Sequence, residues 1–277
     1  MEITNQEFNL FRVYIEEVSG ISLEEEKTYL IESRLKGLLD EFGCHNYGDL
    51  YRKAKENASP LLRNKIVDAI TTNETLWFRD KGPYVVFEQM FLPEMVRQIA
   101  AGKSKVRIWS AACSTGQEPY SLAMGISEFL LWHGNGVADH SHFEIFATDI
   151  SSQALSVGEL GAYDQLSMGR GLSDAYKMKY FKQTGRFSII DSKIKKMVEF
   201  KEFNLLNDFG ALGTFDAIFC RNVAIYFSHD VKVQLFEKLR NILRPGGIFI
   251  VGTSETLSYY SKGFKGMEFN NYPYYVS

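Results

Sequence analysis

Polar side chains lie at the ends of three segments of this sequence, or shortly after them, and these segments have the apolar character of buried strands. The segments and their polar residues are VRIWSAA (106–112) with Glu118, HFEIFATD (142–149) with Asp149, and FDAIFCRN (215–222) with Arg221, Asn222 and, a little further on, Tyr226. In open α/β sheets, ligands bind at the carboxyl ends of the strands, where the strand order reverses. A carboxylate such as Asp149 can accept hydrogen bonds from both hydroxyls of a ribose, and Glu118 can pair with an α-amino group. These residue types predict a site for a nucleoside cofactor.

Both carboxylates also have a purely structural alternative. Asp149 is of a residue type that often caps the N-terminus of a helix. Acidic residues such as Glu118 are common in the first turn of a helix, where they complement its dipole. The turn after the first strand contains Gly116 alone, so the GxGxxG pattern is absent and NAD or FAD is disfavoured. Residues 220–227 also lack the Asn/Asp-Pro-Pro-aromatic motif of DNA amino-methyltransferases, which act on a flipped base.

Strands and helices must alternate after Lys81-Gly82-Pro83 to position these residues. Besides the three strands, the pattern predicts a helix from Pro119 to Leu131, a helix from about His229 to Leu243, and a further strand in IFIVGTS (248–254). Such alternation predicts a doubly wound, Rossmann-like parallel sheet covered on both faces. Residues 185–203 interrupt it with short β-rich pieces, and we expect a small inserted antiparallel β-subdomain there.

The first part of the chain has a different pattern, in which apolar residues such as Phe8, Phe11 and Ile15 recur at helical spacing. We therefore expect a helical N-terminal domain over residues 1–75 and an α/β domain over residues 76–277. Basic residues gather within the helical part, at Arg34, Lys36, Arg52, Lys53 and Lys55. They form either a solvated helix face or a docking surface.

Composition narrows the class of protein. The 277 residues suit one α/β domain with a smaller domain attached. A net charge of -3 gives no basic excess for binding nucleic acid, and no stretch reaches the roughly 18 apolar residues of a membrane span. The N-terminus lacks the features of a secretory signal, so we expect a cytoplasmic protein. Cys44, Cys113 and Cys220 are widely spaced without a CxxC, so neither a disulfide framework nor a metal site is expected.

Several longer blocks resemble the chemotaxis-receptor glutamate methyltransferases, the CheR family. The blocks are Thr-Thr-Asn-Glu-Thr-Leu-Trp-Phe-Arg-Asp (71–80), Ser-Thr-Gly-Gln-Glu-Pro-Tyr-Ser (114–121), Ala-Thr-Asp-Ile (147–150), Asn-Leu-Leu (204–206), Phe-Asp-Ala-Ile-Phe-Cys-Arg-Asn-Val (215–223) and Leu-Arg-Pro-Gly-Gly (243–247). They span nearly the whole chain in the family's order. Two positions depart from the family pattern: Ala224 replaces a frequent Met, and Thr253 replaces the His of Gly-His-Ser-Glu, which can alter a hydrogen bond near the site.

The resemblance implies a class I methyltransferase domain that uses S-adenosylmethionine and releases S-adenosylhomocysteine. The positions that match the family's cofactor-binding residues are Asn73, Thr75, Arg79, Glu118, Asp149, Asn204, Leu205, Arg221 and Asn222. Arg79 and Tyr226 match residues near the methyl-transfer centre, which implies catalytic, orienting roles for both. The implied partner is the cytoplasmic helical region of chemoreceptors, whose glutamate-rich helices would meet the basic residues of the helical domain. We expect a monomer, and the edge of the β-subdomain is a candidate site for a receptor tail.

A glutamate nucleophile fits this chemistry, because its side-chain pKa is near 4.3 and it is already ionised at neutral pH. It can attack the sulfonium methyl without a general base, and the enzyme must chiefly supply in-line placement. Two alternatives stay open. One is a methyltransferase for nucleic acid or small molecules, and the other is a non-catalytic module that senses the cofactor or binds a receptor without modifying it.

Overall fold

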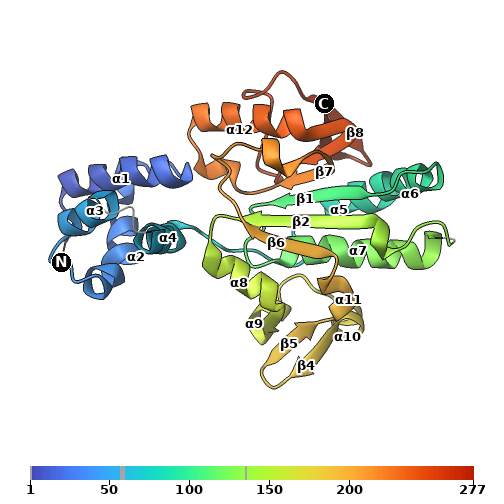
Figure 1. The fold of residues 1–277 in the computed structure, drawn as a ribbon, viewed down its shortest axis with the longest axis horizontal. Helices are drawn as coiled ribbons and strands as arrows, with labels where there is room; N and C mark the ends of the chain where they lie inside the picture. Colours follow the sequence, from blue (N-terminus) through green and yellow to red (C-terminus); the bar gives the residue numbers. More distant parts are fainter. Residues whose placement is uncertain (1, 57–59, 135) are drawn as a thin grey trace.

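The computed structural model describes residues 2–56, 60–134 and 136–277 (Figure 1). Its helices are α1 (Asn5–Ser19), α2 (Thr28–Glu41), α3 (Tyr47–Glu56), α4 (Pro60–Ile70), α5 (Lys81–Val86), α6 (Leu92–Ala100), α7 (Gln117–His133), α8 (Ser152–Leu160), α9 (Gln165–Met168), α10 (Asp174–Tyr180), α11 (Ser192–Lys195) and α12 (His229–Ile242). Its strands are β1 (Val106–Ala111), β2 (Phe143–Asp149), β3 (Ala162–Asp164), β4 (Phe181–Thr184), β5 (Phe187–Ile190), β6 (Val198–Glu202), β7 (Phe215–Cys220), β8 (Leu243–Ile250), β9 (Lys265–Phe269) and β10 (Tyr272–Val276). None of the helices in these ranges combines the length and the apolar character that crossing a membrane requires.

Helices α1 to α4 form a helical domain with a hydrophobic core of its own. Helix α1 begins with a capping box, in which Thr4 and Glu7 exchange side-chain and backbone hydrogen bonds, and it ends at Gly20, whose φ of 78° suits a glycine C-cap. Phe11, Ile31 and Leu50 are among the fully buried residues of the core. In Figure 1 this domain lies beyond one end of the sheet, and helix α4 is followed by an irregular segment that leads into the second domain.

The second domain contains a seven-stranded sheet in the order β6-β2-β1-β7-β8-β10-β9. The first five of these strands are parallel, and β10 pairs antiparallel with β8 and β9. The chain builds outward from β1 to β2 and β6, and then returns to the other side of β1 for β7 and β8. The strand order therefore reverses between β1 and β7, which is where α/β proteins bind ligands.

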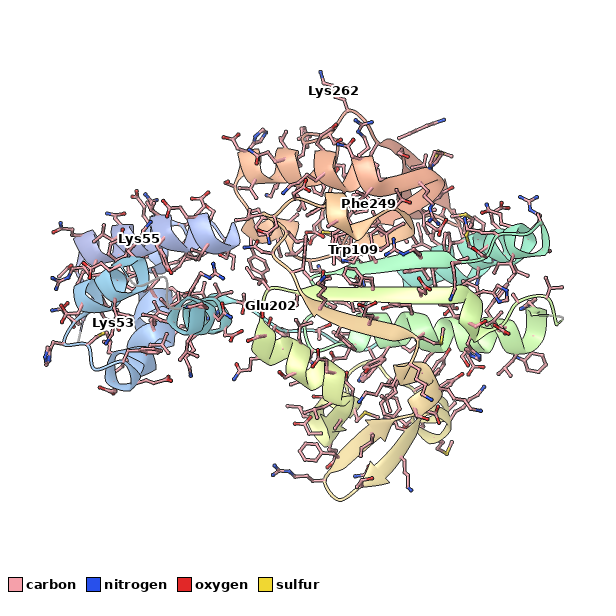
Figure 2. All side chains as sticks on the ribbon, viewed as in Figure 1. Lys53, Lys55, Trp109, Glu202, Phe249 and Lys262 are labelled. Carbon is pink, nitrogen blue, oxygen red and sulfur yellow. The ribbon has the colours of Figure 1, made fainter. Side chains whose placement is uncertain are left out.

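Side chains of the central strands alternate between two cores, one on each face of the sheet. Ile108 and Phe219 pack with residues of α5 to α7, whereas Trp109 and Phe249 pack with residues of α12. Figure 2 shows Trp109 and Phe249 between the sheet and α12. Burial on both faces explains why these strands are almost continuously apolar, and it confirms the predicted doubly wound sheet.

The inserted antiparallel subdomain is present, but its predicted range of 185–203 is wrong at both ends. The small sheet has the order β3-β5-β4 and therefore begins before residue 185, at Ala162. Residues Val198–Glu202 form β6, which pairs parallel with β2 at the edge of the main sheet. An edge strand keeps one polar face, so its alternating sequence is indistinguishable from that of a hairpin strand.

Candidate functional site

One cavity lies where the helical domain meets the carboxyl ends of β1, β2 and β7, and its volume is about 210 Å³. Its walls include the segments that follow these three strands and the irregular segment after α4. All of the residues predicted to bind the cofactor or to take part in catalysis line it: Asn73, Thr75, Arg79, Glu118, Asp149, Asn204, Leu205, Arg221, Asn222 and Tyr226. The fold thus brings together residues that are far apart in the chain, from Asn73 to Tyr226.

Backbone strain is concentrated around this cavity. Phe78, Asp80, Ala112, Ser114 and Asn222 have φ values between 48° and 61°, in the left-handed region that L side chains rarely adopt. Among the described residues, the other non-glycine residues with positive φ are the two asparagines of the β9–β10 hairpin. Each such residue costs roughly 1–2 kcal/mol, and strain of this kind typically clusters at functional sites.

Gly116 ends the loop after β1 and begins α7. Its φ of 92° is unfavourable for other residues, and a Cβ atom there would lie 3.0 Å from both the Cα atom of Gly158 and the hydroxyl of Tyr163. The same hydroxyl donates to the carbonyl oxygen of Thr115 at 2.8 Å. The loop is therefore fixed from outside the cavity, and only glycine fits its last position.

Asp149, at the end of β2, is 6% exposed and is oriented by backbone groups from two loops. Its Oδ2 atom accepts from the backbone N–H of Ser114 at 2.8 Å, and its Oδ1 atom accepts from that of Ser151 at 2.9 Å. Burial raises the pKa of this carboxyl, although both hydrogen bonds act in the opposite direction. Ser151, rather than Asp149, caps helix α8 through its hydroxyl, so the structural alternative for Asp149 does not apply.

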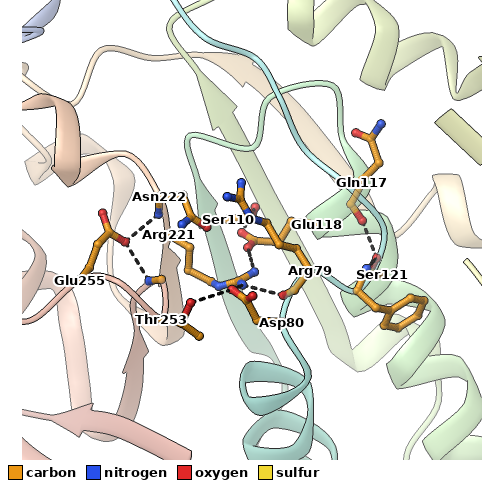
Figure 3. Close-up of polar contacts among 12 residues, drawn as sticks. Arg79, Asp80, Ser110, Gln117, Glu118, Ser121, Arg221, Asn222, Thr253 and Glu255 are labelled. Atoms are coloured by element: carbon orange, nitrogen blue, oxygen red, sulfur yellow. Dashed lines mark hydrogen bonds and ion pairs between the residues drawn. The ribbon is translucent and has the colours of Figure 1, made fainter. Parts of the chain in front are cut away.

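Arg221 is the centre of a buried charge cluster (Figure 3). Its side chain is 2% exposed, and its two terminal nitrogens donate to Glu118 Oε2 at 2.7 Å and to Asp80 Oδ2 at 2.8 Å. Glu118 also accepts from the hydroxyl of Ser110 at 2.8 Å. Burial disfavours the charge of Arg221, but the nearby carboxylates outweigh this effect and raise the pKa of the guanidinium. One cation and two carboxylates leave the cluster with a net negative charge.

Sequence reasoning missed Asp80 and Ser110, which complete this cluster, and Tyr84, which is buried close to Glu118 and Arg221. Asp80 is the last residue of the block 71–80, but neither its φ of 61° nor its contact with Arg221 can be inferred from the neighbouring sequence. Among the described residues, the hydroxyl of Tyr84 and the Nε atom of Arg221 are the buried side-chain polar atoms without a hydrogen-bond partner. Burial raises the pKa of Tyr84, so its hydroxyl stays protonated.

Glu255 is a further residue that the sequence did not single out. Its Oε2 atom accepts from the backbone N–H of Asn222 at 2.6 Å and from that of Gly252 at 2.8 Å, so it joins the loops that follow β7 and β8 (Figure 3). Thr253, at the position where the family often has His, contacts Asp80 Oδ2 at 3.5 Å. This contact is at the limit of a hydrogen bond and contributes little.

Asn73 and Asn204 belong to the contacts between the two domains. The backbone carbonyl of Asn73 accepts from the hydroxyl of Ser114 at 2.7 Å. The side chain of Asn204 donates to the carbonyl of Val18, the penultimate residue of α1, at 2.7 Å. Asn204 thus has a structural partner already, and its predicted role in cofactor binding stays a prediction, as do those of the other lining residues.

Arg79 and Tyr226 line the cavity and are both accessible to solvent. Arg79 is half-buried, and within the described ranges its guanidinium makes a single, weak hydrogen bond, to the carbonyl of Glu74 at 3.4 Å. Tyr226 is 36% exposed, and its backbone carbonyl accepts from the backbone N–H of Ser22. Both side chains are therefore available to a substrate that enters from solvent.

The five basic residues predicted to dock a partner do not form one uniform surface. Arg52, Lys53 and Lys55 on α3 are exposed, and Figure 2 labels Lys53 and Lys55 on the helical domain. Arg52 pairs with Asp49, Lys53 donates to the carbonyl of Phe42 at 2.7 Å, and Lys55 pairs with Glu17 at 2.6 Å. On α2, Lys36 is exposed, whereas Arg34 is half-buried and turned toward the end of α4.

Comparison with known proteins identifies the family. Residues 73–272 match the family model described as "CheR methyltransferase, SAM binding domain", and residues 6–71 match "CheR methyltransferase, all-alpha domain". The chain is 44% identical over 260 residues to Chemotaxis protein methyltransferase 1 of Pseudomonas aeruginosa and 42% identical over 260 residues to Chemotaxis protein methyltransferase Cher2 of Pseudomonas putida, and each alignment covers 93% of both proteins. It is also 42% identical over 258 residues to Chemotaxis protein methyltransferase 1 of Vibrio cholerae, which covers 92% of this chain and 91% of the relative. These matches confirm S-adenosylmethionine as the cofactor, and the chain belongs to the CheR family of methyltransferases.

Proposed function

We propose that this protein transfers the methyl group of S-adenosylmethionine to glutamate side chains in the cytoplasmic helices of chemoreceptors. The lining of the cavity is the observation that supports a glutamate carboxylate as the nucleophile. None of the described lining residues is a histidine, and the lining carboxylates are engaged: Glu74 with Arg170, Glu118 with Arg221 and Ser110, and Asp149 with two backbone N–H groups. A hydroxyl nucleophile would need a base, whereas a glutamate arrives already ionised.

The residues present fit the cofactor. Each carboxylate oxygen of Asp149 accepts one backbone N–H and retains a lone pair for a ribose hydroxyl. The negative cluster of Glu118, Asp80 and Arg221 suits the α-ammonium group of the cofactor. When bound, S-adenosylmethionine supplies an electrophilic methyl carbon on a positively charged sulfur.

Arg79 and Tyr226 are proposed to orient the substrate carboxylate. A tight bidentate pair between an arginine and the nucleophile would stabilise the ground state and slow attack. We therefore propose a single, loose contact from Arg79, with the hydroxyl of Tyr226 as a second donor. Because an ionised carboxylate needs no proton removed, alignment is the main contribution expected of these two residues.

The exposed basic residues Lys36, Arg52, Lys53 and Lys55 are proposed as the docking surface for the glutamate-rich receptor helix. Three of them are already paired within the helical domain, so each adds little on its own. Opposite charge along a surface mainly accelerates and orients association. Replacing Arg52, Lys53 and Lys55 together by Glu is expected to raise the receptor KM and to leave the cofactor Kd unchanged, as calorimetry and initial rates would measure. An unchanged KM would reject the surface.

The same proposal has two further parts. It divides the chain into a docking domain (1–75) and a catalytic domain (76–277), and it places the binding of a receptor tail along the β-subdomain. The small sheet has β3 and β4 as its two edges. An edge strand offers unpaired backbone groups to an extended peptide. A receptor fragment that lacks its tail should then be methylated with a higher KM and the same kcat.

The decisive experiment is transfer of radiolabelled methyl from S-adenosylmethionine to receptor cytoplasmic fragments. Label that is released by mild base identifies a carboxyl methyl ester. Asp149→Ala should abolish transfer, whereas Asp230→Ala, which removes a carboxylate that is 93% exposed on α12, should not. Tight binding of S-adenosylhomocysteine without any base-labile label on several receptors would refute the proposed substrate and favour a sensing module or another acceptor.

A further inference from the structure

The guanidinium of Arg34 holds the end of helix α4. Its Nη1 atom donates to the carbonyl oxygens of Ile70 and, at 3.1 Å, of Thr71, and it lies 3.4 Å from that of Ala69. Its Nη2 atom donates to the hydroxyl of Thr72 at 3.2 Å. The last carbonyl groups of a helix have no partner within the helix, and a cation at this end also complements the helix dipole. Arg34 therefore fixes four consecutive residues from a neighbouring helix.

These residues continue directly into the wall of the cofactor cavity. Ile70, Thr71, Thr72 and Asn73 all line the cavity. The carbonyl of Asn73 accepts from the hydroxyl of Ser114, whose backbone N–H donates to Asp149. A chain of direct contacts thus runs from α2, through the end of α4, to the carboxylate proposed to bind the ribose.

Helix α4 is also anchored on its other side. The carboxylate of Asp68 accepts from the hydroxyl of Ser151 at 2.7 Å and from that of Ser152 at 3.3 Å, at the start of α8. Asp68 therefore fixes the body of α4 against the second domain, while Arg34 fixes its last turn and the residues beyond it. Without Arg34, the segment 71–73 would keep an anchor just before it, at Asp68, and one at its last residue, Asn73.

We infer that Arg34 is a positioning residue for the cofactor cavity rather than a contact for the receptor. Its charged group faces helix carbonyls inside the helical domain, and a receptor carboxylate would have to compete with four acceptors already in place. Lys36, two residues along the same helix, is exposed and makes no hydrogen bond or ion pair within residues 2–56, 60–134 and 136–277. The two neighbouring cations therefore have different roles.

The test compares Arg34→Lys, Arg34→Ala and Lys36→Ala in the full chain. Lysine keeps the charge but cannot hold several acceptors in one plane, as the guanidinium does. Arg34→Lys and Arg34→Ala should both raise the Kd for S-adenosylhomocysteine about fivefold or more, measured by calorimetry. Lys36→Ala should leave this Kd unchanged and raise the receptor KM. In Arg34→Lys, amide hydrogen exchange should accelerate at residues 71–73 and not throughout α1–α3.

A receptor contact gives the opposite pattern. If Arg34→Lys binds S-adenosylhomocysteine within twofold of the wild-type affinity while the receptor KM rises in Arg34→Ala, the inference is overturned. It is also overturned if exchange accelerates evenly over α1–α4. Should Arg34→Ala fail to fold, Arg34→Lys alone decides. The inference rests on the proposed function only for the receptor KM, because affinity and exchange are measured without a receptor and stand even if no receptor glutamate is methylated.

Discussion

Replacement of Arg221 by Met tests the buried charge cluster most directly. Methionine fills much of the same space but removes the bonds to Glu118 (2.7 Å), Asp80 (2.8 Å) and the carbonyl of Arg79 (2.6 Å). The side chains of Glu118 and Asp80 are 12% and 29% exposed, so both carboxylates would stay largely buried without a cation. The variant should therefore lose stability as well as cofactor affinity.

The magnitude follows from the burial of the partners. Hydrogen bonds to charged groups contribute about 1.5–3 kcal/mol each, but three bonds that share one guanidinium do not add. Removing one partner of a buried ion pair costs about 3–5 kcal/mol. The partial exposure of Asp80 favours the lower end, about 3 kcal/mol. For a chain of this size the melting temperature should fall by roughly 6–12 °C.

Urea unfolding of the ligand-free protein measures this loss, with Arg240→Met as the control. Arg240 pairs with Glu237 on the surface of α12 at side-chain exposures of 36% and 54%, where water and salt screen the pair, so its loss should leave the free energy of unfolding nearly unchanged. Adding Glu118→Gln to Arg221→Met should recover part of the stability, because it removes one uncompensated charge. A loss below about 1 kcal/mol, with no recovery in the double variant, would show that water solvates these carboxylates and that the reasoning from burial is wrong.

Three further predictions concern the cavity. Burial raises the pKa of Asp149 above its ordinary 3.8. Because the ionised form is the one expected to accept the ribose hydroxyls, affinity for S-adenosylhomocysteine should fall on acidification at a higher pH than for an ordinary Asp. The affinity of Asp149→Asn, measured by calorimetry, should lack this pH dependence. Tyr226→Phe should lower kcat roughly 5- to 30-fold, the equivalent of about 1–2 kcal/mol of alignment, and leave the Kd of S-adenosylhomocysteine within twofold; an unchanged kcat in single-turnover assays would exclude the orienting role. Gly116→Ala should destabilise the fold by about 1–3 kcal/mol in urea unfolding and weaken cofactor binding, since φ is 92° and the new methyl would crowd Gly158; wild-type stability would contradict the assigned strain.

The sequence predicted the sheet well because its central strands are buried on both faces. Residues such as Ile108 and Trp109 pack into opposite cores, so the strands appear as nearly continuous apolar runs, which their short length and their β-branched and aromatic residues distinguish from helices. The polar residues at the ends of β1, β2 and β7 followed from the rule that strand ends meet at one edge. The same logic failed for β6, whose polar face at the sheet edge resembles that of a hairpin strand.

What the sequence could not predict depends on contacts between distant segments. Asp80 and Arg221 are 141 positions apart, and Asn204 and Val18 are 186 apart. Charge alone grouped Arg34 with Lys36, whereas burial and the four acceptors around its guanidinium separate them. Glu255 lacked a signal because its partners are backbone N–H groups, which every residue but proline has.

The walls of the cavity come from both domains, each of which has a hydrophobic core of its own. A bound ligand therefore also holds the two domains together. A ligand that binds only the assembled walls adds RT ln(1 + [L]/Kd) to the cohesion of the domains, about 2.7 kcal/mol at 100 times Kd. S-adenosylmethionine and its product S-adenosylhomocysteine share most of their groups, so this stabilisation largely persists after methyl transfer. Depletion of both would leave the two domains joined by their direct contacts alone, such as Asp68 with Ser151 and Asn204 with Val18, and would lower the free energy of unfolding.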